Sequence, residues 1–270
     1  MSISGTHTHS GPAGFLQYVL YQVTSLGFVQ ETFDAWVSGI ANSVVMAYKS
    51  MQPGSILINE GKLFDSNINR SPTSYLLNSQ SERDQYPDGD TDKTMLQLNF
   101  VSEKSGKSIG VLNWFAVHAT SMNNTNTLIS GDNKGYAAYA LERDINGPDS
   151  IPGMGPFVAA FASTNLGDVS PNTMGAKCID TGLPCDGTTS TCNGRCENCI
   201  AFGPGKNGDM VESTQIIGNN QYQFAKKLMS QPATALSGPV DFRHSFVNFE
   251  ELEVQLSNGQ KTTLCRPAMG

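Results

Sequence analysis

The chain has 270 residues, a net charge of −7 and an isoelectric point near 5.0, with 39% hydrophobic and 15% charged residues. This length allows one large domain or two small ones, and the composition suits a loop-rich globular protein rather than a disordered chain or a coiled coil. The acidic balance and the lack of a basic stripe argue against nucleic acid as a partner. No apolar run approaches the roughly 20 residues that a membrane helix needs, and no signal peptide precedes residue 5.

The first part of the chain is predicted to form two helices and a strand. Apolar residues recur at helical spacing over residues 12–30 and again over 31–50, and Met51-Gln52-Pro53-Gly54 should end the second helix. Residues 55–60 are typical of a strand. A polar loop is then expected from residue 69 to about 92.

The remainder of the chain alternates between strands and helices. The alternation of residues 95–101 and 108–115 predicts a hairpin that turns at 104–107. This order indicates an α/β fold, with a mixed β-sheet core flanked by helices. The other predicted elements are helices over 131–144 and 209–230, a short, fully buried strand over 156–162 and a strand-like end over 247–256.

Five of the six cysteines lie within residues 178–199, and the sixth is Cys265. Two interpretations compete. The spacing Cys196-x-x-Cys199 occurs in zinc sites, whereas a disulfide-linked loop would form in an oxidising compartment. The disulfide interpretation is favoured because residues 186–191 have loop composition and no histidine is nearby.

Three of the four histidines occur in two segments that favour metal binding. His7 and His9 lie in the turn over residues 5–12, and His118 follows an apolar, strand-like run. Histidine is the commonest metal ligand, and a His-x-His pair on a strand end would point both rings to one face. The alternative for each histidine is a hydrogen-bonded core residue. With so few histidines, a zinc site would need a carboxylate, a tyrosine or water to complete it.

Ser170 and Arg70 are weaker candidates on pattern alone. The strand before residue 163 is followed by a turn over 167–171. Ser170 in this turn would be placed as a nucleophile is at the end of a strand, with backbone N–H groups nearby to stabilise an oxyanion. Ser170 does not lie in a Gly-x-Ser-x-Gly pattern. No general base for it is obvious in the sequence, and a metal-activated water would fill the role of that base. An ordinary Asp/Ser turn is the alternative. Arg70 would either hold a substrate oxygen through its guanidinium or be a solvated loop charge.

Two segments match the sequence pattern for N-glycosylation. They are Asn69-Arg70-Ser71 and Asn123-Asn124-Thr125. Both are relevant only for a secreted chain, and such matches are common by chance.

Four segments, taken in order and approximate spacing, resemble the neutral (alkaline) ceramidases: residues 5–12, 68–72, 114–118 and 165–172. The resemblance covers essentially the whole chain. It implies a zinc-dependent hydrolase that cleaves the amide bond of ceramide, at a membrane surface, to sphingosine and a fatty acid. It also implies an extracellular, plasma-membrane-associated or secretory location. Carried over by position, His7 and His118 would be the zinc ligands. Ser170 would be the catalytic serine, and His9 and Arg70 would bind the substrate.

The chain also departs from the family pattern. The family completes its zinc site with a glutamate and a tyrosine from further along the chain, and it has a leading segment and a C-terminal immunoglobulin-like domain. Residues 1–270 are therefore expected to be a partial catalytic domain, in which Cys265 has lost its partner and Cys196 is additional. The isolated chain is expected to be inactive or nearly so, whereas the longer protein would be the active enzyme. The alternative is a truncated, non-catalytic protein that binds lipid or another partner.

Overall fold

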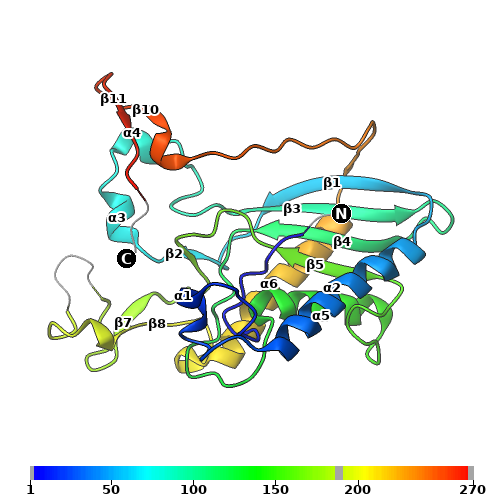
Figure 1. Ribbon diagram of the computed structural model, residues 1–270, viewed down its shortest axis with the longest axis horizontal. Coiled ribbons are helices and arrows are strands. Elements are labelled where there is room, and N and C mark those ends of the chain that lie inside the picture. Colours follow the sequence, from blue (N-terminus) through cyan, green and yellow to red (C-terminus); the bar gives the residue numbers. More distant parts are fainter. Residues whose placement is uncertain (1–2, 186–190, 267–270) are drawn as a thin grey trace. The chain divides into compact units, whose positions relative to one another are not determined.

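The computed structural model describes residues 3–185 and 191–266, and the chain divides into two compact units, Met1–Leu236 and Ser237–Gly270. Residues 186–190, which the sequence assigns to a loop, lie outside the described residues. The first unit has a mixed sheet with helices packed on it (Figure 1). The predicted α/β class is therefore confirmed.

A five-stranded sheet forms the centre of the first unit, in the order β5-β4-β3-β1-β9. The pair β4 and β5 is parallel, and the other neighbouring pairs are antiparallel. The hairpin β3–β4 and the strand β1 are confirmed, because local alternation is enough to specify them. The strand bounds are Gly54–Lys62 for β1, Thr94–Ser102 for β3, Ser108–Phe115 for β4, Val158–Ala162 for β5 and Thr234–Ala235 for β9.

Two helices, α5 (Asp132–Asn146) and α6 (Met210–Met229), cover one face of this sheet (Figure 1). The helix α5 lies between β4 and β5 in the chain, as a parallel strand pair requires. The opposite face is more open, since Leu96 and Leu98 there are only half-buried. The buried apolar residues of the core are Leu63, Met95, Val111, Phe115, Val117, Ala137, Leu141, Phe157, Phe161, Ile217, Ala225 and Leu228.

The N-terminal region contains one long helix rather than two. The predicted helix over 31–50 is confirmed as α2 (Gln30–Lys49), but the one over 12–30 is wrong, because only α1 (Val19–Gln22) is helical there. Gly14 and Leu26 have positive φ angles of 88° and 58°, which no α-helix contains. At Gly14 a side chain would also collide with that of Val29.

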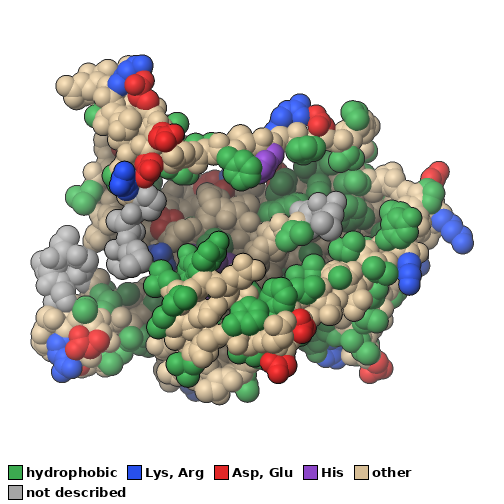
Figure 2. Space-filling view, in the orientation of Figure 1, with side chains coloured by type: hydrophobic (Ala, Val, Ile, Leu, Met, Phe, Trp, Pro, Cys, Tyr) green, Lys and Arg blue, Asp and Glu red, His purple; other side chains and the backbone are tan. Residues whose placement is uncertain are grey.

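No residue of α2 is buried by the described part of the chain, and apolar side chains gather over α1 and α2 (Figure 2). None of the helices in the described ranges has both the length and the hydropathy that crossing a bilayer requires.

Short elements replace several predicted loops and strands. The loop over 69–92 contains two one-turn helices, each started by a residue that favours this position: Pro72 in α3 and the capping serine Ser79 before α4. The strand over 156–162 is shorter than predicted and is not fully buried. The bounds of the short elements are Ile68–Asn69 (β2), Pro72–Leu76 (α3), Gln80–Arg83 (α4), Val169–Ser170 (β6), Ala176–Cys178 (β7), Cys196–Asn198 (η1), Cys199–Ala201 (β8) and Lys206–Gly208 (η2).

The second unit contains a short 3-10 helix, η3 (Phe249–Glu251), and an antiparallel pair, β10 (Glu253–Gln255) with β11 (Lys261–Thr263). The predicted strand over 247–256 is therefore only partly right. Asn248 caps the helical turn by accepting a hydrogen bond from the backbone of Glu250, and this interrupts the extended backbone.

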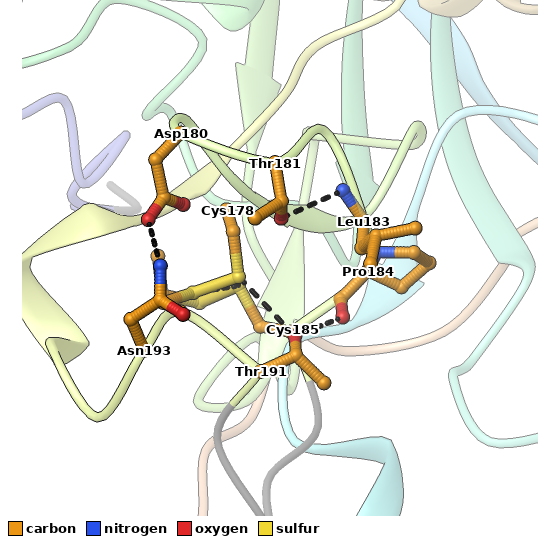
Figure 3. The surroundings of a disulfide bond; sticks show 10 residues. Cys178, Asp180, Thr181, Leu183, Pro184, Cys185, Thr191 and Asn193 are labelled. Carbon is orange, nitrogen blue, oxygen red and sulfur yellow. Dashed lines mark hydrogen bonds between the residues drawn. A yellow bond between two sulfur atoms is a disulfide. The ribbon is translucent and has the colours of Figure 1, made fainter.

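Two disulfides connect the cysteine-rich segment, Cys178–Cys192 and Cys185–Cys199. Figure 3 shows the surroundings of a disulfide, with Cys178 and Cys185 labelled. The disulfide interpretation is confirmed, and these sulfur atoms are not available as zinc ligands. The strands β7 and β8 pair so that Cys178 lies opposite Cys199, which brings the two bonds together. Among the described residues Cys196 and Cys265 form no disulfide.

We expect the double variant Cys178→Ser, Cys192→Ser to open the β7–β8 pair locally. Each disulfide closes a loop with a sequence separation of 14, and a loop of that size corresponds to a stabilisation of about 3 kcal/mol. Amide hydrogen exchange of the β7–β8 pair should accelerate by about 100-fold, while the exposed Cys196→Ser serves as the control with little change. Unchanged exchange in the double variant would contradict a stabilising role for this bond.

Candidate metal and active site

The three histidines of the two segments meet in one cluster. The ring centroids of His7 and His9 are 4.8 Å apart, those of His7 and His118 are 4.8 Å apart, and those of His9 and His118 are 5.9 Å apart. One ring nitrogen from each lies within 4.8 Å of the other two. His7 and His9 are exposed, whereas His118 is buried. The cluster is therefore open on one side, where a ligand could enter.

The turn over residues 5–12 is held against the segment after β4 by backbone contacts. Thr8 forms a parallel bridge to Ala119, and the backbone N–H of His9 donates to the Ala119 carbonyl at 3.3 Å. The expected strand-like alternation of His7 and His9 is wrong, because His7 has a positive φ of 61°. Histidine is one of the residues enriched in this region of backbone space. The rings meet because the turn folds at His7.

His118 is oriented by a neighbouring carbonyl. Its Nδ1 lies 2.9 Å from the Val169 carbonyl oxygen, and its backbone N–H donates to the same oxygen at 3.1 Å. Because a carbonyl only accepts hydrogen bonds, Nδ1 must carry the proton, and in the neutral ring Nε2 keeps its lone pair. Histidine ligands of metals are held in this way. His118 lies beyond the end of β4, which ends at Phe115, rather than on the strand itself.

Burial and nearby positive charge favour the neutral form of two rings. Partial burial lowers the pKa of His9, and the neighbouring His7 and Arg70 lower it further. The pKa of His118 is also lowered, chiefly by burial, and His7 and Arg70 act in the same direction. A metal ligand must be a neutral imidazole. The donor set and its protonation therefore fit a zinc ion.

Ser170 and Arg70 lie beside the cluster, Ser170 at the end of the short strand β6 and Arg70 directly after its partner strand β2. Ile68 of β2 pairs with Ser170 of β6, and the backbone N–H of Arg70 donates to the Asp168 carbonyl at 2.8 Å. Ser170 thus lies in a two-residue strand rather than in the expected turn. It directly follows Val169, whose carbonyl holds His118. Its Oγ accepts a hydrogen bond from the Asn172 backbone at 3.1 Å, which leaves the hydroxyl proton free to donate.

Three buried polar residues at the start of α5 hold the backbone around the cluster in place. The sequence does not predict them. Asp132 accepts hydrogen bonds from the backbone N–H groups of Ser121 and Met122, and Asn133 Nδ2 donates to the His118 carbonyl at 2.9 Å. Lys134 is the third residue and is 1% exposed. Polar residues at a helix start are usually solvated, so nothing in their spacing indicates burial.

The structure distinguishes the two matches to the glycosylation pattern. Asn69 is 5% exposed and its Nδ2 donates to Asp168 Oδ2, whereas Asn123 is exposed. When the chain passes through a eukaryotic secretory pathway, we expect a glycan at Asn123 only. Treatment with an N-glycosidase should then shift the mass of Ser71→Ala but not that of Thr125→Ala. A shift that persists in Thr125→Ala would contradict this assignment.

Comparison with known proteins identifies related chains over the whole length. The family described as "Neutral/alkaline non-lysosomal ceramidase, N-terminal" matches residues 1–270. Neutral ceramidase B of Dictyostelium discoideum is 52% identical over 99% of this chain and 37% of its own length, and neutral ceramidase of Drosophila melanogaster is 47% identical over 100% and 39%. The crystal structure of neutral ceramidase from Pseudomonas aeruginosa superimposes with a TM-score of 0.76 at 36% identity, covering 99% of this chain and 37% of that one. The chain thus spans less than two fifths of these relatives.

Proposed function

This chain belongs to the neutral/alkaline non-lysosomal ceramidase family, and we propose that its protein hydrolyses the N-acyl amide bond of ceramide, with zinc, to sphingosine and a fatty acid. The names of the relatives support the substrate, and one observation supports the chemistry. That observation is the histidine cluster, in which the Nδ1 of His118 is committed to the Val169 carbonyl and Nε2 is left for a metal.

In this proposal His7 and His118 hold the zinc ion, and His9 faces the substrate. His9 lies in the same cluster and has the chemistry of a third ligand as well. Zinc supplies a positive charge that polarises the amide carbonyl and lowers the pKa of water. Among the described residues, no carboxylate joins the three histidines in this cluster.

The chain's own groups would bind and orient the amide. The guanidinium of Arg70, whose charge acts on His9 and His118, would hold a polar oxygen of the substrate. The Ser170 hydroxyl is fixed by the Asn172 N–H and would direct its proton toward the reacting amide. We assign Ser170 as the catalytic serine on its position beside the His118 anchor.

The setting of the proposed reaction follows from the cysteines and the substrate. Two disulfides favour an oxidising compartment, so we propose that the protein enters the secretory pathway and acts outside the cell or at the plasma membrane. Ceramide is a lipid, so the protein would meet it at a membrane surface.

A hydrolysis assay tests the proposal. The protein is stripped with a chelator and incubated with ceramide in mixed micelles, with zinc or with magnesium as the matched control, and sphingosine and fatty acid are measured by mass spectrometry. Equal release of both products with zinc alone is the expected result. Ceramide that is bound but not cleaved would indicate a non-catalytic lipid-binding protein. Zinc-independent release would overturn the proposed metal.

A further inference from the structure

Lys134 is an unusual residue in this fold, because its side chain is almost fully buried without an acidic partner. It is 1% exposed, and no ion pair of Lys134 occurs among the described residues. A buried ammonium group is costly unless its protons are hydrogen-bonded. Burial of this kind commonly marks a group with a specific role rather than one that adds stability.

The contacts of Lys134 are the ends of two parallel strands. Its Nζ donates to the carbonyl of Phe115, the last residue of β4, at 3.0 Å, and to the carbonyl of Ala162, the last residue of β5, at 2.9 Å. The segments that leave these two ends carry His118 and Ser170. One ammonium group therefore connects the starting points of both site segments.

A second branch leads from Lys134 to the backbone of His118. Nζ lies 3.5 Å from Gln221 Oε1, and Gln221 Nε2 donates to Asn133 Oδ1 at 3.0 Å. Asn133 Nδ2 in turn donates to the His118 carbonyl at 2.9 Å. Gln221 and Asn133 are both completely buried. The helices α5 and α6, which supply these side chains, lie together on one face of the sheet (Figure 1).

We propose that Lys134 is a positioning residue, which fixes the ends of β4 and β5 and, through Gln221 and Asn133, the His118 backbone, so that the histidine cluster and Ser170 keep their relative places. This inference rests on the function proposed above. Among the described residues, Lys134 forms hydrogen bonds to Phe115, Ala162 and Gln221 and none to the histidine rings or the Ser170 hydroxyl. Its effect on chemistry would pass through the backbone.

The test compares Lys134→Met with Lys226→Met in the full chain. Methionine keeps the length of the stem and removes the ammonium, and Lys226 on α6 is half-exposed and pairs with Asp144. The zinc dissociation constant is measured by competition with a chromophoric chelator, without substrate, and kcat and KM are measured separately. Lys134→Met should weaken zinc binding by about 10–100-fold, as substitutions behind metal ligands do, and lower kcat more than it raises KM. Lys226→Met should leave all three unchanged.

Two further measurements test the proposal if Lys134→Met does not fold or if the wild-type chain binds no zinc. If Lys134→Met does not fold, Gln221→Met removes only the second branch and should weaken zinc binding in the same direction. If the wild-type chain binds no zinc, the ¹⁵N resonance of the protonated Nδ1 of His118 reports the same anchor, and it should broaden or disappear in the variant. Zinc affinity, kcat and this resonance all unchanged in a folded variant would overturn the proposal. If Lys134→Met weakens zinc binding as expected but the wild-type chain does not hydrolyse ceramide, only the proposed function is overturned.

Discussion

The variant His118→Ala is expected to lose zinc binding and to lower kcat/KM for ceramide by on the order of 10³-fold or more. His118 is the buried member of the cluster, and its ring is fixed by the Val169 carbonyl. Its Nε2 is therefore the best oriented nitrogen for a metal. Alanine removes this nitrogen and leaves two exposed rings, His7 and His9, which cannot hold a zinc ion tightly by themselves.

His244→Ala is the matched control for this variant. His244 is an exposed histidine in the unit Ser237–Gly270, and it is not a member of the cluster. The zinc content after dialysis and the hydrolysis rate should equal those of the wild-type chain. A His118→Ala variant that retains one zinc per chain and hydrolyses ceramide at a rate within tenfold of wild type would contradict the assignment of His118.

The regular elements of the first unit could be predicted because their signals are local. The alternation in β1, β3 and β4 and the helical spacing in α2, α5 and α6 each lie within one continuous segment. The failure over residues 12–30 has a different cause. Its apolar residues have helical spacing, but Gly14 and Leu26 adopt positive φ angles. A leucine at position 26 does not predict a positive φ angle, so this angle is known only from the folded chain.

The candidate site could be predicted only as a set of residue types. Histidines in two segments indicate a metal site, and the resemblance to the family strengthens Ser170 and Arg70, which are weak candidates on pattern alone. The sequence does not indicate the groups that orient these residues. The carbonyl that holds the His118 ring belongs to Val169, which is 51 residues away. Because every residue has a carbonyl, nothing in the sequence distinguishes this one. Asn133 and Lys134 could not be predicted either, because their partners lie on β4, on β5, on α6 and in the segment after β4. Long-range contacts of this kind depend on topology, which residue spacing does not encode.

The pH dependence of stability should differ between the wild-type chain and Lys134→Met. Burial lowers the pKa of Lys134 from 10.5 to about 7. Between these values the unfolded chain binds a proton that the folded chain lacks, so this residue makes the free energy of unfolding rise with pH. The limiting slope is about 1.4 kcal/mol per pH unit, which gives about 2–3 kcal/mol between pH 7 and 9.

Urea unfolding at pH 6, 7.5 and 9 measures this difference. The wild-type chain should gain stability over Lys134→Met as the pH rises above 7, and the two curves should run parallel below it. Lys226→Met is again the control, because the bond to Asp144 raises the pKa of Lys226 and keeps it protonated throughout this range. Parallel curves for wild type and Lys134→Met up to pH 9 would show that Lys134 stays charged when buried.

Lys134 can hold the ends of β4 and β5 even after it loses its proton. A neutral amine keeps two N–H donors, and the two shortest contacts of Lys134 are to the carbonyls of Phe115 and Ala162. The contact to Gln221 Oε1, at 3.5 Å, is the one that a neutral amine would give up first. Zinc affinity should therefore change little as Lys134 titrates, although the free energy of unfolding changes. A positioning role that depends on hydrogen bonds rather than on charge predicts this separation of the two properties.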